Sequence, residues 1–253
     1  MKRLLIILSV CLIFAACQKQ DLQQYTEKPR VYLSLSKSTF YAPFPNSIAT
    51  NVRIDYAPQK SSKVTDTLKL NVQISGPAAT VDRTFALERN GNEGNAVEGV
   101  DYDVLDKGFL IPAGLYSTIV RVVVRRNANM AKQAVNFSYA LKANENFELG
   151  PQSDTARFSS NSGIVSITRL KVTATDVLNK PDNWDSFIFK YFGVYSNFKH
   201  RFIVDVLAKV SFPSTTSAGV MNRNKTTLTN ALKQYNETHP EKLKDENGTE
   251  ISF

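Results

Sequence analysis

The feature that most constrains the fold is a two-residue alternation of apolar and polar side chains in several separate segments. In residues 118–125 (TIVRVVVR), valines alternate with Arg121 and Arg125. Successive side chains of a strand point to opposite faces, so this period predicts strands that are buried on one face. We expect both arginines to face solvent. The same alternation occurs in residues 31–36, 68–74 and 135–141.

Turn-forming residues separate these segments at the spacing of an antiparallel sandwich. They lie at Pro43 and Pro45, Gly76-Pro77, residues 90–95 (NGNEGN), residues 112–114 (PAG) and Gly150-Pro151. Regular turns between short alternating segments are typical of a sandwich of about seven strands. The sequence therefore predicts a mainly β protein with a sandwich over residues 30–170.

The pattern changes after about residue 170, and helical spacing replaces alternation. Apolar residues recur three and four positions apart at Phe198, Phe202 and Val206, and again at Leu228, Ala231, Leu232 and Tyr235. Such spacing predicts two amphipathic helices, the second ending before Pro240. A turn and a short strand are expected in residues 247–253. Residues 171–253 are thus predicted to form a small α+β domain.

The N-terminus has the pattern of a secretory signal peptide over residues 1–16. Lys2 and Arg3 precede an apolar run at residues 4–16, which is shorter than the roughly 20 residues of a membrane-spanning helix. The run ends in Phe14-Ala15-Ala16-Cys17, which resembles the lipobox of bacterial lipoproteins. This resemblance implies cleavage before Cys17, lipidation of its thiol and a polar tether over residues 17–29. Ordinary signal cleavage that leaves a free thiol is the alternative.

The residues after Cys17 bear on where such a lipoprotein would reside. Gln18 differs from the aspartate that retains lipoproteins at the inner membrane, and Asp21 is the one acidic residue close to the cysteine. We expect a lipid-anchored protein of the outer membrane that faces the cell surface.

Charge and cysteine content exclude other classes of protein. Lys and Arg number 31 against 23 Asp and Glu, giving a net charge of +8, but the basic residues form no stripe interleaved with aromatic residues. A nucleic-acid partner is therefore not expected. The two cysteines, Cys11 and Cys17, both precede the body of the chain, which excludes disulfides and cysteine-based zinc sites there.

Short motifs resemble the Calx-β type of immunoglobulin-like sandwich. They are Gly99-Val100-Asp101-Tyr102, residues 109–114 (FLIPAG), residues 118–122 (TIVRV) and residues 146–149 (NFEL). The resemblance implies an antiparallel sandwich whose G-x-D-Y turn precedes the F-x-x-P-x-G turn and a late strand.

The whole chain also resembles an uncharacterised family of surface lipoproteins from the Bacteroidota. The resemblance is carried by residues 144–150 (NENFELG), 180–184 (KPDNW), 192–203 (FGVYSNFKHRFI) and 248–253 (GTEISF). Genes of that family often neighbour SusC/SusD-like uptake systems. The resemblance therefore implies an accessory binding role in glycan acquisition, with a polysaccharide and SusC/SusD-like proteins as partners. A scaffold that docks on envelope proteins without binding glycan is the alternative.

Catalytic motifs are missing from the sequence. The two histidines, His200 and His239, lack metal-ligand spacing, and no nucleophile elbow or phosphate-binding loop is present. Asp101 and Asp103 lie too close in sequence to suggest a glycosidase pair, as do Asp182 and Asp185, because such carboxylates face each other across a cleft. We expect a non-catalytic protein, with a hydrolase as the least favoured reading.

Acidic residues near the G-x-D-Y motif are candidate calcium ligands. These are Glu93, Glu98, Asp101, Asp103 and Asp106. Carboxylates are the ligands that calcium prefers, but Asp101 can instead cap its turn while the others remain in solvent. We expect no bound metal or other cofactor.

The aromatic segment around Trp184 is the candidate glycan site. Sugar rings stack on exposed aromatic rings, and neighbouring polar groups bind hydroxyls. The candidate residues are Asp182, Asn183, Trp184, Asp185, Tyr191 and Tyr195. The alternative is that these rings pack in the core of the C-terminal domain, as large aromatic residues usually do.

Overall fold

A computed structural model describes residues 27–35, 51–91, 93–150, 154–155, 164–165 and 168–253. The predicted signal peptide, Cys17 and most of the predicted tether lie outside the described residues. Within these ranges no helix combines the length and the apolar character needed to cross a membrane.

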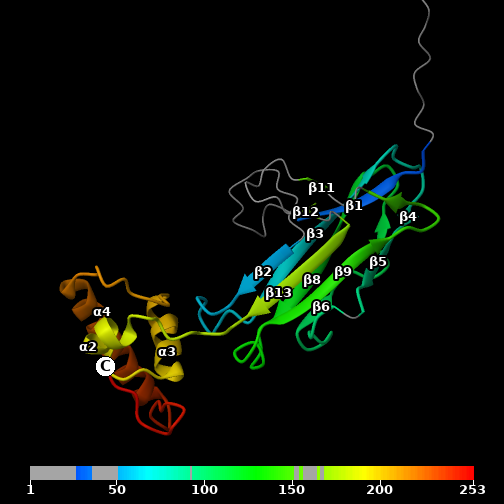
Figure 1. The fold of residues 1–253 in the computed structure, drawn as a ribbon. Helices are drawn as coiled ribbons and strands as arrows, with labels where there is room; N and C mark the ends of the chain where they lie inside the picture. The colour runs from blue at the N-terminus through cyan, green and yellow to red at the C-terminus, as the bar shows by residue number, and fades with distance from the viewer. Residues whose placement is uncertain (1–26, 36–50, 92, 151–153, 156–163, 166–167) are drawn as a thin grey trace, which may run out of the picture.

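Residues 27–175 contain the sheets and are called the β unit (Figure 1). The first sheet has the order β10-β1-β3-β8-β6, formed by Glu148–Leu149, Arg30–Leu35, Thr65–Ser75, Ser117–Arg125 and Tyr102–Val104. The second has the order β2-β13-β9-β5, formed by Asn51–Asp55, Arg169–Thr175, Val135–Lys142 and Ala86–Arg89. Two separate two-stranded sheets complete the β unit: β4 (Arg83–Thr84) with β7 (Leu110–Ile111), and β11 (Asp154–Thr155) with β12 (Ile164–Val165).

Both large sheets are mixed, whereas the sequence predicted antiparallel pairing throughout. β1 runs parallel to β10, and β13 runs parallel to β2. A parallel pair joins segments that are far apart in the chain, so local alternation and turn signals do not reveal it. The mainly β character is confirmed.

The inward faces of the two sheets form one hydrophobic core. Val120, Val122 and Val124 of β8 are buried, while Arg121 and Arg125 on its other face are exposed, as the alternation predicted. The second sheet contributes Phe137, Tyr139 and other alternate residues of β9 to the same core. The two-residue period therefore places the apolar side chains of these strands correctly, although Ser138 on the other face of β9 is buried as well.

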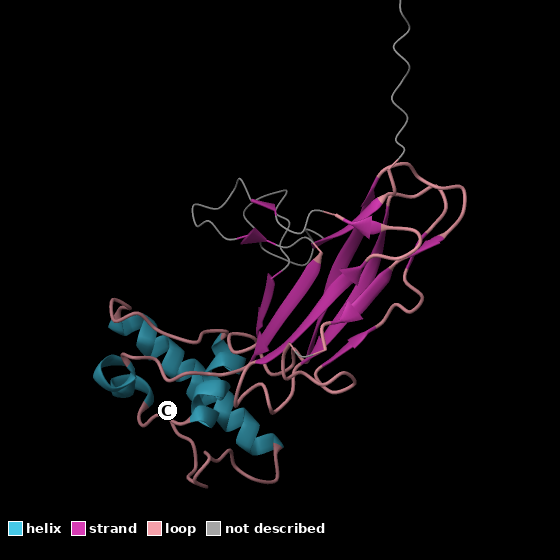
Figure 2. Cartoon of the chain, turned by 45° about the vertical axis from the view of Figure 1, so that its right-hand side comes forward, coloured by secondary structure: helices cyan, strands magenta, loops and turns pink. Residues whose placement is uncertain are grey.

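Residues 177–253 are called the helical unit (Figure 2). A π-helical turn at Trp184–Ile188 leads into α2 (Phe189–Phe192), followed by α3 (Asn197–Leu207) and α4 (Ala218–Thr238). Both predicted helices are present, and α4 ends before Pro240. Near the C-terminus, Lys244 and Glu250 form an isolated bridge where a short strand was expected.

The helical unit follows directly from a strand of the second sheet. β13 runs to Thr175, so the domain boundary expected at residue 170 falls inside this strand. In both views the helices lie at the end of the β unit that is opposite to the start of β1 (Figures 1 and 2).

Candidate functional site

Trp184 is a core residue of the helical unit. Its exposed fraction is 1%, and its indole Nε1 donates a hydrogen bond to the Gly193 carbonyl at 3.0 Å. Tyr195 meets the indole edge to face, with ring centres 4.9 Å apart. Of the two interpretations of Trp184, the structure agrees with packing in the core, and the ring has no free face on which a sugar could stack.

The turn at Gly193 is held by an unusual set of side-chain donors. Buried Lys199 donates through Nζ to the carbonyls of Phe192 at 2.9 Å and Val194 at 2.8 Å. Together with the Trp184 bond, three successive carbonyls are satisfied by side chains. Burial lowers the pKa of Lys199 from its ordinary value. Trp184, Gly193 and Lys199 thus have linked structural roles, which sequence reasoning missed.

Each of the two histidines is bonded to a backbone carbonyl of the helical unit. His200 is buried on α3, where Nε2 lies 2.8 Å from the Val210 carbonyl, so this nitrogen carries the proton. Its Nδ1 is buried without a hydrogen-bond partner, and burial lowers the pKa of the ring. His239 caps the exposed end of α4 through the Tyr235 carbonyl. This geometry gives neither ring a reacting partner.

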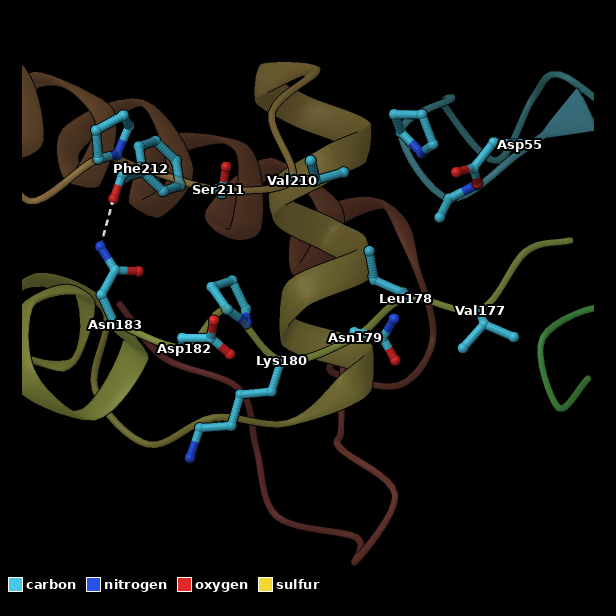
Figure 3. Close-up of a pocket in the computed structure, with 14 residues that line it drawn as sticks. Asp55, Val177, Leu178, Asn179, Lys180, Asp182, Asn183, Val210, Ser211 and Phe212 are labelled. Carbon is cyan, nitrogen blue, oxygen red and sulfur yellow. Dashed lines mark hydrogen bonds between the residues drawn. The ribbon is translucent and has the colours of Figure 1, made fainter. Parts of the chain in front are cut away.

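An open cleft of about 600 Å³ lies where the helical unit meets the β unit (Figure 3). One wall is the chain after β2, the floor is the segment that links the units, and the third side is the chain after α3. The lining residues are Asp55, Ala57, Pro58, Val177, Leu178, Asn179, Lys180, Pro181, Asp182, Asn183, Val210, Ser211, Phe212 and Pro213. Two of the predicted glycan-binding residues, Asp182 and Asn183, are therefore brought into a cleft.

The polar groups of the cleft differ in how they are already bonded. Asn183 donates through Nδ2 to the Phe212 carbonyl at 2.8 Å, which ties two sides of the cleft together (Figure 3). Lys180 donates to Asp185 at 2.6 Å. Asp182 is exposed, and within the described part of the chain its carboxylate has no hydrogen bond or ion pair. Asp182 is thus a carboxylate of the cleft that is available to a ligand, alongside the exposed side chains of Asn179 and Ser211.

The other predicted glycan-binding residues lie outside the cleft. Tyr191 is buried in the helical core, and Tyr195 packs on Trp184 while its hydroxyl donates to Asn197. Asp185 pairs with Lys180 on the surface. Tyr191, Tyr195 and Asp185 therefore pack or pair within the helical unit and do not line the cleft.

Three of the candidate calcium ligands are bonded to other groups of the protein. Buried Asp101 accepts hydrogen bonds from Val97 N and Asn127 Nδ2, both at 2.7 Å, so it caps its turn. Asp103 forms an ion pair with Arg125. Asp106 accepts from the Arg121 guanidinium at 2.6 Å, and this bond lowers the pKa of the carboxyl below its ordinary value.

Glu98 is exposed at the edge of the same region. Over the described ranges, no three histidine, cysteine, aspartate or glutamate side chains lie together as metal ligands would. The arrangement accounts for Asp101, Asp103 and Asp106 without a cation.

The junction between the units contains a buried ion cluster that sequence reasoning missed. Asp176 accepts from Arg126 at 2.8 Å on one side and from Arg201 at 2.7 Å on the other. Arg201 also donates to the carbonyls of Ala57 and Gln59, each at 3.1 Å. These contacts join residues 25 to 144 positions apart in sequence, so no local motif predicts them.

Comparison with known families gives one match over most of the chain. A model for a domain of unknown function, DUF4843, matches residues 25–209. The chain belongs to the DUF4843 family. The matched range includes the β unit, the segment that links the units and α3, and it ends before the cleft residues 210–213 and α4. No match was found among curated proteins.

Solved structures show only distant similarity. A Bacteroides ovatus xyloglucanase in complex with a heptasaccharide shares 9% identity at a TM-score of 0.24, and the match covers 60% of this chain and 20% of that one. The N-terminal domain of PorA shares 6% identity at 0.25, covering 57% and 96%. A Mobiluncus mulieris adhesin shares 11% identity at 0.26, covering 59% and 58%. The family assignment therefore depends on the sequence match, and these solved structures give no argument about function.

Proposed function

We propose that this DUF4843 protein is a non-catalytic binding module that a lipid on Cys17 holds at the outer surface of a bacterium of the Bacteroidota. The ligand we propose is a glycan, acquired through a neighbouring SusC/SusD-like system. The observation that carries the proposal is the open cleft at the junction, with the unpaired Asp182 carboxylate on its floor.

The chemistry of the cleft supports a neutral glycan. Carboxylates such as Asp182 and Asp55 accept hydrogen bonds from sugar hydroxyls, while Lys180 is neutralised by Asp185. An acidic glycan would meet repulsion from the two cleft carboxylates. Proline and aliphatic side chains, including Pro58, Pro181 and Pro213, supply the apolar surface against which C–H groups of a sugar pack.

The decisive test uses Asp182→Asn, which keeps the size of the side chain and removes its charge. A panel of neutral polysaccharides is screened by affinity electrophoresis, and the affinity for any that bind is measured by calorimetry. We expect Asp182→Asn to weaken binding about tenfold, as the loss of a hydrogen bond to a charged group does.

Glu237→Gln is the matched control, because Glu237 is an exposed carboxylate on α4 that does not line the cleft. Equal affinity of the Asp182→Asn variant and the unmodified protein would show that the ligand binds outside the cleft. Failure of every polysaccharide in the panel to bind would refute the glycan proposal.

A specific observation favours a second candidate function, docking on an envelope protein. Phe189, Val194 and Phe198 of the helical unit are exposed at 49%, 72% and 54%. If they contact a SusC/SusD-like partner, Phe198→Ser should abolish its recovery in a pull-down from native membranes. Recovery of the same transporter by the variant would count against this surface.

We also propose that the β unit is an immunoglobulin-like module of the Calx-β type. The G-x-D-Y motif supports this: Asp101 caps its turn and Tyr102 lies in the core at the start of β6. An experimental structure that matches Calx-β strand order would test the assignment.

A further inference from the structure

Three apolar side chains project into solvent at one end of the β unit. Val81, Leu115 and Tyr116 are exposed at 65%, 52% and 57%. They belong to two loops, residues 76–82 and 112–116, which together are called the tip. Single exposed apolar residues are common on protein surfaces. Here, however, three of them come from neighbouring loops at one end of the molecule.

Hydrogen bonds hold the two loops of the tip against each other. Gly114 N donates to the Ala79 carbonyl, and Ala113 N donates to the Asp82 carboxylate, both at 2.8 Å. The Tyr116 carbonyl accepts from Ile74 N at 3.0 Å, which fixes this loop to β3. The apolar side chains are therefore presented by a braced backbone.

The tip lies at the end of the molecule where the N-terminal segment joins the β unit. Arg30, the first residue of β1, pairs with Ser75, which directly precedes the tip. The helical unit lies at the opposite end in both views (Figures 1 and 2). Glu27 follows Cys17 by ten positions, so this stretch reaches at most about 35 Å when fully extended.

We propose that the tip rests in the interfacial region of the lipid bilayer that holds the anchor. This inference rests on the lipid anchor of the proposed function and adds a second contact with the membrane. Leu115 and Val81 enter the boundary of the acyl chains, while the ring and hydroxyl of Tyr116 lie at the level of the headgroups. The contact orients the β unit and directs the helical unit away from the membrane.

The test uses tryptophan as a reporter of contact with lipid. The mature chain that begins at Cys17 has one thiol, because Cys11 precedes it, so a maleimide-bearing phospholipid can be attached there. The lipidated chain is bound to vesicles of phosphatidylethanolamine and phosphatidylglycerol that carry brominated acyl chains, which quench tryptophan on contact. The native Trp184 is buried in the helical unit and gives a constant background.

Tyr116→Trp places the reporter at the tip, and Val100→Trp is the matched control. Val100 is exposed at 51%. The backbone nitrogen of Arg125 donates to the carbonyl of its neighbour Asp101, and Arg125 ends β8 on the side away from the tip. We expect quenching and a blue shift of the emission for Tyr116→Trp and no change for Val100→Trp. Adding Leu115→Asp and Val81→Asp to the tip variant should abolish the quenching.

Absence of quenching in Tyr116→Trp, or equal quenching of both reporters, would overturn the proposed contact. The anchor is tested separately in cells by membrane fractionation of Cys17→Ala. Because the vesicle experiment attaches the lipid chemically, it reports on the tip even when the cellular experiment refutes natural lipidation. If natural lipidation fails, the proposed biological role of the tip fails with it, whatever the vesicles show.

Discussion

At the scale of single residues, Trp184 shows how an aromatic motif can be structural. Its ring is enclosed, and its Nε1 bonds to the Gly193 carbonyl. We expect Trp184→Ala to lower the free energy of unfolding by about 3–5 kcal/mol, because it leaves a large cavity. Trp184→Phe should cost about 1–3 kcal/mol, since it keeps the ring and leaves the carbonyl without a donor.

Urea denaturation monitored by circular dichroism measures both changes. The exposed Asp182→Asn variant is the reference and should change the free energy of unfolding by less than about 0.5 kcal/mol. A loss below about 1 kcal/mol for Trp184→Ala would contradict the burial of this ring.

Gly94 is a second residue whose identity is fixed by its surroundings. Its φ is +105°, and a Cβ there would lie 2.0 Å from the Asn136 carbonyl oxygen. We expect Gly94→Ala to destabilise the protein by about 3 kcal/mol, because neither the backbone angle nor the space suits a side chain. Gly99 has a φ of +85° but open space around it. Gly99→Ala should therefore cost only about 1 kcal/mol in the same denaturation assay, and equal losses would refute the steric argument.

At the scale of elements, the sequence period of α3 did not predict which face of the helix is buried. Phe198 was expected on the apolar face but is exposed, whereas Lys199 and His200 are buried. The helix begins after Ser196, whose hydroxyl accepts from Lys199 N. The backbone carbonyls of the Gly193 turn then attract the lysine amine inward. Periodicity reports hydrophobicity alone, so it cannot anticipate polar groups that are buried to satisfy the backbone.

Burial of His200 on α3 predicts a pH dependence of stability. Its pKa in the folded state lies below the ordinary value of 6.5, so the unfolded chain binds a proton more readily. The stability that the neutral, buried ring contributes is therefore fully present above about pH 6.5 and is lost as the pH falls toward the folded-state pKa. Between pH 7.5 and 5.5, we expect the protein to lose more stability than His200→Gln, whose amide can still donate to the Val210 carbonyl.

Urea denaturation at the two pH values gives the comparison directly. The difference between the two proteins isolates His200 from the other titrating groups. Identical pH dependence of the two proteins would show that the ring is accessible to protons in the folded state.

Strand prediction succeeded where pairing is local. Residues of β3, β8 and β9 alternate clearly, and β3 pairs antiparallel with β8 over nine residue pairs. β2 and β13 were not predicted, because their parallel pairing depends on segments more than a hundred residues apart. The cleft escaped prediction for the same reason. Asp182 and Asn183 were recognised, but the segments at Asp55 and Phe212 join them only in the folded chain.

At the scale of the whole molecule, Asp176 joins the two units. Its carboxylate is buried between Arg126 of the β unit and Arg201 of α3. We expect Asp176→Ala to lower the free energy of unfolding by about 3–5 kcal/mol, because two guanidinium groups lose their buried partner. The linking segment should also become sensitive to limited proteolysis as the helical unit separates.

Asp103→Ala provides the comparison, because Asp103 pairs with Arg125 in a more exposed position. Asp103→Ala should lower the free energy of unfolding by less than about 1 kcal/mol and should leave the pattern of proteolysis unchanged. Similar losses for the two variants would show that the Asp176 cluster does not hold the units together.

The uninterrupted course of β3 has a mechanical consequence. Its eleven residues run from the helical end of the β unit to Ser75 beside the tip, a length of about 35 Å at 3.3 Å per residue. A lever of that length would convert a tilt of about 10° at the tip into a sideways displacement of about 6 Å at the cleft. If the tip bears on the bilayer as we propose, the lateral search range of the cleft would be governed by a few side chains at the far end of the molecule.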